Sequence, residues 1–137
     1  MVEHLNQTVV EMARCMMKSK QVPACLWGEA VATTVYVLNR SPTKSLNGVT
    51  MFEAWHGRKP SVKHMKNFGC IGHVKKIGPG IQKLSDRSQK MVFIGYEEGT
   101  KGYRMLEPES RTLHISRDVI FEEDQAWDWT NFTAKSN

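Results

Sequence analysis

Three side chains in the middle of the chain have the types and the spacing that could begin a metal site. His64, Cys70 and His73 form the pattern H-x5-C-x2-H, and imidazole and thiolate are ligands that zinc prefers. A closed structural zinc site takes four ligands, whereas only these three are visible. Cys70 also stands where strand alternation expects a small buried residue, and an unpaired cysteine is commonly buried. We therefore expect a buried thiol here, with no metal and no cofactor.

Other arrangements that would carry chemistry are incomplete. Ser41, Ser61 and Ser116 form no recognisable nucleophile elbow. The Gly-Pro-Gly stretch at 78–80 reads as a turn, because no Lys-Ser or Lys-Thr pair follows it to complete a phosphate loop. These residues favour a binding protein over an enzyme.

The charges of the chain are unevenly distributed. The net charge is +5. Positions 58–90 contain nine Lys or Arg and a single acid, Asp86. Positions 118–128 hold five acids and no base. A basic segment of this kind either attracts a polyanion or is a solvated face that keeps the protein soluble. If nucleic acid is the partner, the candidate contacts are Lys63, Lys66, Lys75, Lys76, Lys83 and Arg87.

Apolar spacing predicts helices in the first part of the chain. The period of 3.6 residues indicates one helix over 5–19 and a second over 23–39, with Pro23 in its first turn. A Thr-x-x-Glu capping box opens a short third helix over 51–55. These helices bury only part of their apolar stripes, so we expect an interface with another protein or a second copy. Its candidate residues are Val9, Met16, Val31 and Val35.

After Pro60 the apolar period changes toward two, which indicates strands. The expected strands are 68–75, 90–96, 102–107, 112–116 and 118–122. Five short strands with these turn signals predict a small antiparallel barrel, and hence an α+β fold. Trp127 and Trp129 are expected to pack on that barrel. We expect a helical part over 1–60, a barrel domain over 61–124 and a tail over 125–137.

The composition also suggests a compartment. The sequence has neither an apolar run of 18 residues nor a secretory signal. Its three cysteines are an odd number at irregular spacings, which favours free thiols. We therefore expect a reducing compartment, nuclear or cytoplasmic, and no membrane partner.

Nine short stretches together resemble a known family. In this order and spacing they look like the integrase region of Ty1/copia-type retrotransposon polyproteins. The stretches are EHLNQT (3–8), EMAR (11–14), LWGEAV (26–31), VLNRSPT (37–43), AWHGRKP (54–60), FGC (68–70), FIGY (93–96), KGYR (101–104) and SRDVIF (116–121).

This resemblance implies the end of an RNase H-like catalytic core, followed by an SH3-like barrel. It places Glu3 at the third of three catalytic carboxylates, with His4 where arginine is usual. One carboxylate cannot hold the two divalent metals that strand transfer needs. Glu3 is therefore expected to be a relict, and the chain to be a truncated, non-catalytic fragment.

Two functions remain open from the sequence. One is a remnant that binds nucleic acid through phosphate contacts, without reading bases. The other is a protein-interaction module that associates with itself, with the full-length integrase as an inhibitor, or with a host protein. A catalytic integrase is expected only if these residues are part of a longer chain.

Overall fold

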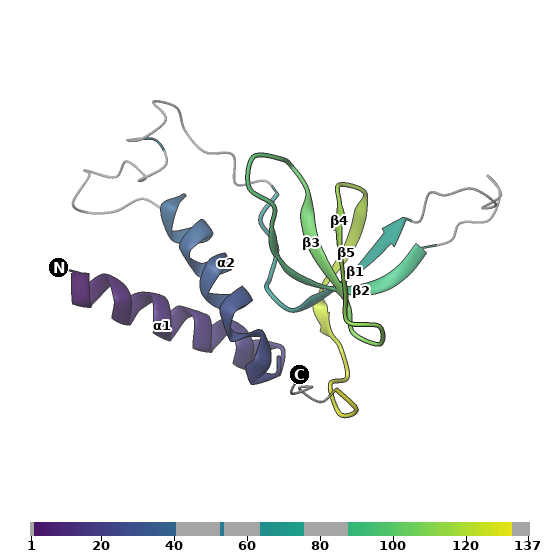
Figure 1. Ribbon diagram of the computed structural model, residues 1–137, viewed down its shortest axis with the longest axis horizontal. Helices are drawn as coiled ribbons and strands as arrows, with labels where there is room; N and C mark the ends of the chain where they lie inside the picture. Colours follow the sequence, from purple (N-terminus) through teal and green to yellow (C-terminus); the bar gives the residue numbers. More distant parts are fainter. Residues whose placement is uncertain (1, 41–52, 54–63, 76–87, 133–137) are drawn as a thin grey trace.

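The computed structural model describes residues 2–40, 53, 64–75 and 88–132, and Figure 1 shows their arrangement. Two helices lie beside a curled sheet of five strands. The predicted α+β class is confirmed. The short helix expected over 51–55 lies outside the described residues except for Glu53, which is helical.

Helix α1 covers Val2–Ser19 and ends in a Schellman motif. The N–H of Val22 donates to the Met17 carbonyl at 2.9 Å, and the N–H of Gln21 donates to the Lys18 carbonyl at 3.2 Å. Gln21 adopts φ 54°, the left-handed conformation usual after such a helix end. Met17 and Val22 belong to one apolar cluster, the hydrophobic contact that accompanies this motif.

The second helix starts later than its sequence suggests. Pro23 has ψ 150°, an extended conformation, so it is not the first residue of an α-helix. A single 3-10 turn, Ala24–Leu26, follows it, and helix α2 covers Trp27–Asn39. The prediction of helix from residue 23 is therefore wrong over its first turn.

Five strands follow, all of them antiparallel to their neighbours. They are β1 (Cys70–Lys75), β2 (Ser88–Tyr96), β3 (Tyr103–Glu107), β4 (Thr112–Ser116) and β5 (Val119–Ala126). Their order in the sheet is β4-β3-β2-β1-β5, which leaves β4 and β5 at the edges. All five expected strands are present. The first begins two residues late, because Gly69 has φ +83°, and the last runs four residues further.

Both faces of the sheet are covered, which explains six consecutive buried residues at the end of β2. On one face Met91 and Phe93 join Cys70 inside the curl of the sheet. On the other face, Val92 and Ile94 pack in a cluster that includes residues of α1 and α2. The helices and the sheet thus share one core cluster, and the division at residue 60 remains a prediction.

Polar contacts also join α2 to the sheet. The Thr33 hydroxyl lies 2.8 Å from the Glu29 carbonyl and 3.3 Å from the Ile94 carbonyl of β2. Arg104 of β3 forms an ion pair with Glu29 at 3.3 Å. Thr33 is buried, and these bonds satisfy its hydroxyl.

The segment after β5 returns to this core. Trp127 and Trp129 are half-buried and pack against the cluster that the helices share with the sheet. The expectation that they pack on the barrel is confirmed, because this cluster contains residues of the sheet.

Candidate nucleic-acid interface

The structure separates the predicted basic run. Lys66 precedes β1, whereas Lys75 is its last residue. At about 3.3 Å per residue, the strand alone puts roughly 17 Å between its ends. The other four predicted contacts, Lys63, Lys76, Lys83 and Arg87, lie outside the described residues. Lys66 and Lys75 therefore belong to two different surfaces.

Lys66 lies in a group of cations and aromatic rings that we call the aromatic–basic cluster. Its members are Arg40, His64, Lys66, Lys101 and Tyr36. The Arg40 guanidinium lies 3.5 Å from the Tyr36 ring centroid. His64 Nε2 lies 2.5 Å from the Tyr36 hydroxyl, and its ring meets the Tyr36 ring edge-on. Arg40, the C-cap residue of α2, and His64, from the segment before β1, thus both contact Tyr36.

Two tyrosines of the sheet, Tyr96 and Tyr103, fix the geometry of this cluster. Tyr96 of β2 stacks on Tyr36 with 4.2 Å between ring centroids. The N–H of Lys66 donates to the Tyr96 hydroxyl at 3.0 Å. The Tyr103 hydroxyl donates to the His64 carbonyl at 3.0 Å. Residues 64–66 are therefore held against the end of the barrel by hydrogen bonds to two of its side chains.

The electrostatic potential around the His64 imidazole is positive, because three cations act on it. Burial lowers the pKa of His64, and Arg40, Lys101 and Lys66 lower it further. Burial also raises the pKa of Tyr36, an effect that Arg40 opposes and the exposed Glu98 supports. Among the described residues, Lys66 and Lys101 form no ion pair. Their charges are thus available to an anion.

Lys75 borders a second surface, a hollow of about 580 Å³. Arg117 and His73 line it as well, but so does Asp118. His73 is 3.5 Å from the Glu122 carboxylate. Ile120, 74% exposed, completes the apolar part of this hollow. Its mixed charges suit a polyanion less well than the aromatic–basic cluster does.

The predicted interface residues of the helices have different environments. Met16 and Val31 pack against the shared core. Val9 is half-buried, and Val35 is 42% exposed. Val10 and Trp27 are also exposed, at 38% and 37%. Of the four predicted residues only Val35 is therefore exposed, and Val10 and Trp27 add to the exposed apolar surface of the helices.

The possible catalytic and metal residues do not come together in the described part of the chain. Glu3 lies in the first turn of α1. Cys70 is fully buried inside the barrel, and its burial raises the pKa of its thiol to about 12. His64 bonds to Tyr36, and His73 pairs with Glu122. No group of three His, Cys, Asp or Glu side chains that could hold a metal occurs among the described residues.

Sequence reasoning missed Tyr36, Arg40 and Lys101 as members of a site. Arg40 and Lys101 do lie within stretches on which the family resemblance depends, VLNRSPT and KGYR. That signal pointed to both positions without showing that they meet. Within the described ranges, no helix is long and apolar enough to cross a membrane.

Comparison with known proteins agrees with this fold. Residues 70–135 match the retroviral polymerase SH3-like domain. Over most of its length the chain is similar to Pol polyproteins of plant transposons. It is 38% identical over 125 residues, or 90% of the chain, to that of transposon TNT 1-94 from Nicotiana tabacum. It is 30% identical over 96% of the chain to that of RE1, and 31% over 88% to that of RE2, both from Arabidopsis thaliana.

The chain is therefore a homologue of a segment of copia-type retrotransposon Pol polyproteins, with an SH3-like barrel of the retroviral polymerase type. It spans only 9% of the length of the TNT 1-94 and RE1 relatives and 8% of RE2. No solved structure matches it.

Proposed function

We infer that this chain is a non-catalytic binding module that contacts the phosphate backbone of nucleic acid through the aromatic–basic cluster. The observation that supports this is the meeting of Arg40, Lys66 and Lys101 around His64. Arg40 stacks on Tyr36, and Arg40, Lys101 and Lys66, which come from three separate segments, all lower the pKa of His64. Such a cluster can contact phosphates, because the ammonium groups of Lys66 and Lys101 can each donate hydrogen bonds to a phosphate oxygen.

Contacts of this kind predict weak binding that depends on salt and little on sequence. Each phosphate neutralised by a cation releases counterions, so affinity falls as the salt concentration rises. A bound phosphate would also favour the protonated form of His64. Binding is therefore expected to tighten as the pH falls toward the pKa of His64, which the fold lowers from its ordinary value.

The absence of catalysis is part of the proposal. The family resemblance assigns Glu3 alone, among the 137 residues, to the three carboxylates of the reaction. Two divalent metals need several converging oxygen ligands. The chain by itself is therefore expected to bind nucleic acid without joining or cutting it.

The test is fluorescence anisotropy with a labelled DNA duplex over a series of salt concentrations. Lys66→Gln and Lys101→Gln should each weaken binding and lower the salt slope by about one unit. Lys18→Gln is the matched control, because Lys18 is exposed on α1 and lies outside the cluster. The proposal is wrong if Lys66→Gln and Lys101→Gln bind DNA as tightly as Lys18→Gln and the unchanged protein do. It is also wrong if the unchanged protein does not bind DNA at low salt.

Association through the helices is the second candidate, with a second copy of the chain as the partner. The exposed apolar side chains of Val10, Trp27 and Val35 favour it. A hollow of about 720 Å³ beside Trp27 adds Met17 and Val22 to this surface. Light scattering during size exclusion would show a dimer, which Val35→Asp should dissociate. A monomer at all concentrations would exclude self-association.

A further inference from the structure

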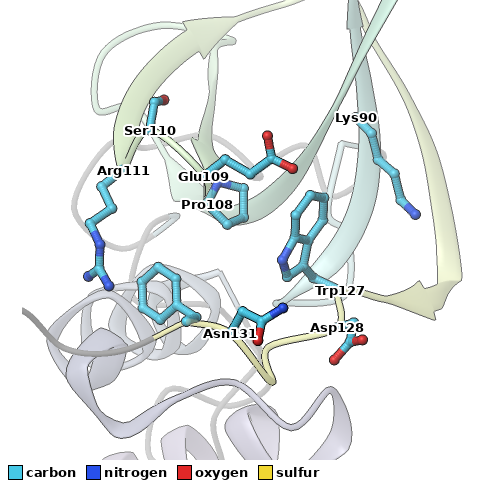
Figure 2. A pocket seen from close by; sticks show the side chains of 9 residues that line it. Lys90, Pro108, Glu109, Ser110, Arg111, Trp127, Asp128 and Asn131 are labelled. Atoms are coloured by element: carbon cyan, nitrogen blue, oxygen red, sulfur yellow. The ribbon is translucent and has the colours of Figure 1, made fainter.

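A hollow of about 560 Å³ is formed by residues outside the aromatic–basic cluster. Lys90 of β2, the turn at 108–111 between β3 and β4, and the segment after β5 line it (Figure 2). Its volume is within the range of ligand sites.

The aromatic walls of this hollow are held in place by the turn that carries them. The N–H and the hydroxyl of Thr130 both bond to Asp128 Oδ1. The N–H of Phe132 donates to the Trp129 carbonyl at 2.9 Å, and the two rings meet edge-on with centroids 4.9 Å apart. Because Trp129 packs against the core, a ligand of these walls meets a surface that is already ordered.

The charges around the hollow disfavour two kinds of ligand, cations and polyanions. Lys90 Nζ lies 5.6 Å from the ring centroid of Trp127, and Arg111 Cζ lies 4.0 Å from that of Phe132. Each ring already has one cation near it, which disfavours a cationic ligand. Glu109 and Asp128 balance Lys90 and Arg111, so a polyanion gains little there.

The aromatic rings and hydrogen-bond donors of the hollow suit a neutral ligand with apolar rings and hydrogen-bond acceptors. No hydrogen bond to the Trp127 indole N–H occurs among the described residues, and this group is not among their buried unsatisfied atoms. Figure 2 shows Trp127, Pro108 and the side chain of Asn131 facing the hollow. A peptide in the polyproline II conformation has no internal hydrogen bonds, so its carbonyls can accept from such donors. Its proline rings pack on aromatic side chains.

We propose that this hollow binds a proline-rich peptide segment of a partner protein. Trp127 and Phe132 provide the apolar walls, and the Trp127 indole and the Asn131 amide donate hydrogen bonds to peptide carbonyls. The low net charge of the hollow fits uncharged residues at the centre of the segment. This site is independent of the proposed contacts with nucleic acid.

A titration with a fluorescein-labelled polyproline peptide of ten residues tests the proposal. Trp127→Phe keeps an aromatic ring and removes the donor, and Asn131→Ala removes an exposed donor. Each should weaken binding about threefold to tenfold, the effect of one hydrogen bond. Trp27→Phe and Asn6→Ala are the matched controls at exposed positions of the helices, and both should bind as the unchanged protein does.

Nuclear magnetic resonance gives a second readout, because the indole N–H signal of Trp127 should shift as the peptide is added. Equal binding of a Gly-Ser peptide of the same length would overturn the proposal, as would unchanged affinity in both site variants. A shift caused by oligothymidine and not by polyproline would overturn it in favour of single-stranded nucleic acid. Lys66→Gln should leave peptide binding intact, so this test is separate from that of nucleic-acid binding.

Discussion

Gly69 lies where the turn between the helices meets the start of the barrel. It has φ +83°, a conformation that costs an L-residue about 1–2 kcal/mol. A Cβ at this position would lie 2.7 Å from Val22 Cγ2 and 2.9 Å from Lys20 Cβ. Overlap of this kind in a packed site costs about 1–3 kcal/mol. Gly69→Ala should therefore reduce the free energy of unfolding by about 2–5 kcal/mol.

Gly99 provides the control, because it separates strain from packing. It has φ +77°, nearly that of Gly69, yet a Cβ there would meet nothing within 4 Å. Gly99→Ala should cost only the backbone strain, about 1–2 kcal/mol. The loss of unfolded-state entropy is common to both variants and cancels in the comparison.

Urea unfolding followed by circular dichroism and by tryptophan fluorescence measures both variants. Replacing Val22 with alanine should relieve part of the overlap, so the double variant Val22→Ala/Gly69→Ala should be less destabilised than the two changes added together. Equal costs for Gly69→Ala and Gly99→Ala would show that the turn at 20–22 does not pack on Gly69, and would refute the reasoning.

Three further predictions concern the cysteines, His64 and Glu3. A thiol reagent at pH 8 should modify the exposed Cys15 and Cys25 quickly and Cys70 only after unfolding, because Cys70 is buried with a pKa of about 12; three fast thiols would contradict its burial. Because the fold lowers the pKa of His64, the unfolded chain binds a proton first, so stability should fall as the pH drops from 6.5 through the lowered value. In thermal melts, the stability of His64→Gln should decrease less over that pH window. A pH profile identical to that of the unchanged protein would exclude His64 as the cause. A DNA-joining assay with Mg²⁺ should detect no product, and activity that Glu3→Gln abolishes would contradict a non-catalytic chain.

The apolar period predicted most of the elements, because it reports directly which face of each element is buried. It placed the end of α1 and both ends of β4 correctly. It failed at Pro23, where an extended ψ precedes a 3-10 turn instead of an α-helix. Proline has a fixed φ but not a fixed ψ, so the sequence alone left both conformations open.

The positions of the basic residues in the fold show why a site is harder to predict from sequence than a fold. In sequence, Lys66 and Lys75 read as one run, yet a strand carries them to opposite ends of the barrel. Arg40 and Lys101 are 61 positions apart and act on the same imidazole. Their meeting depends on the seating of α2 against β2, through Thr33 and through Tyr36 on Tyr96. No apolar period and no sequence motif marks either contact. The distribution of charge along the chain therefore does not show which cations lie close together until α2 and the sheet are placed.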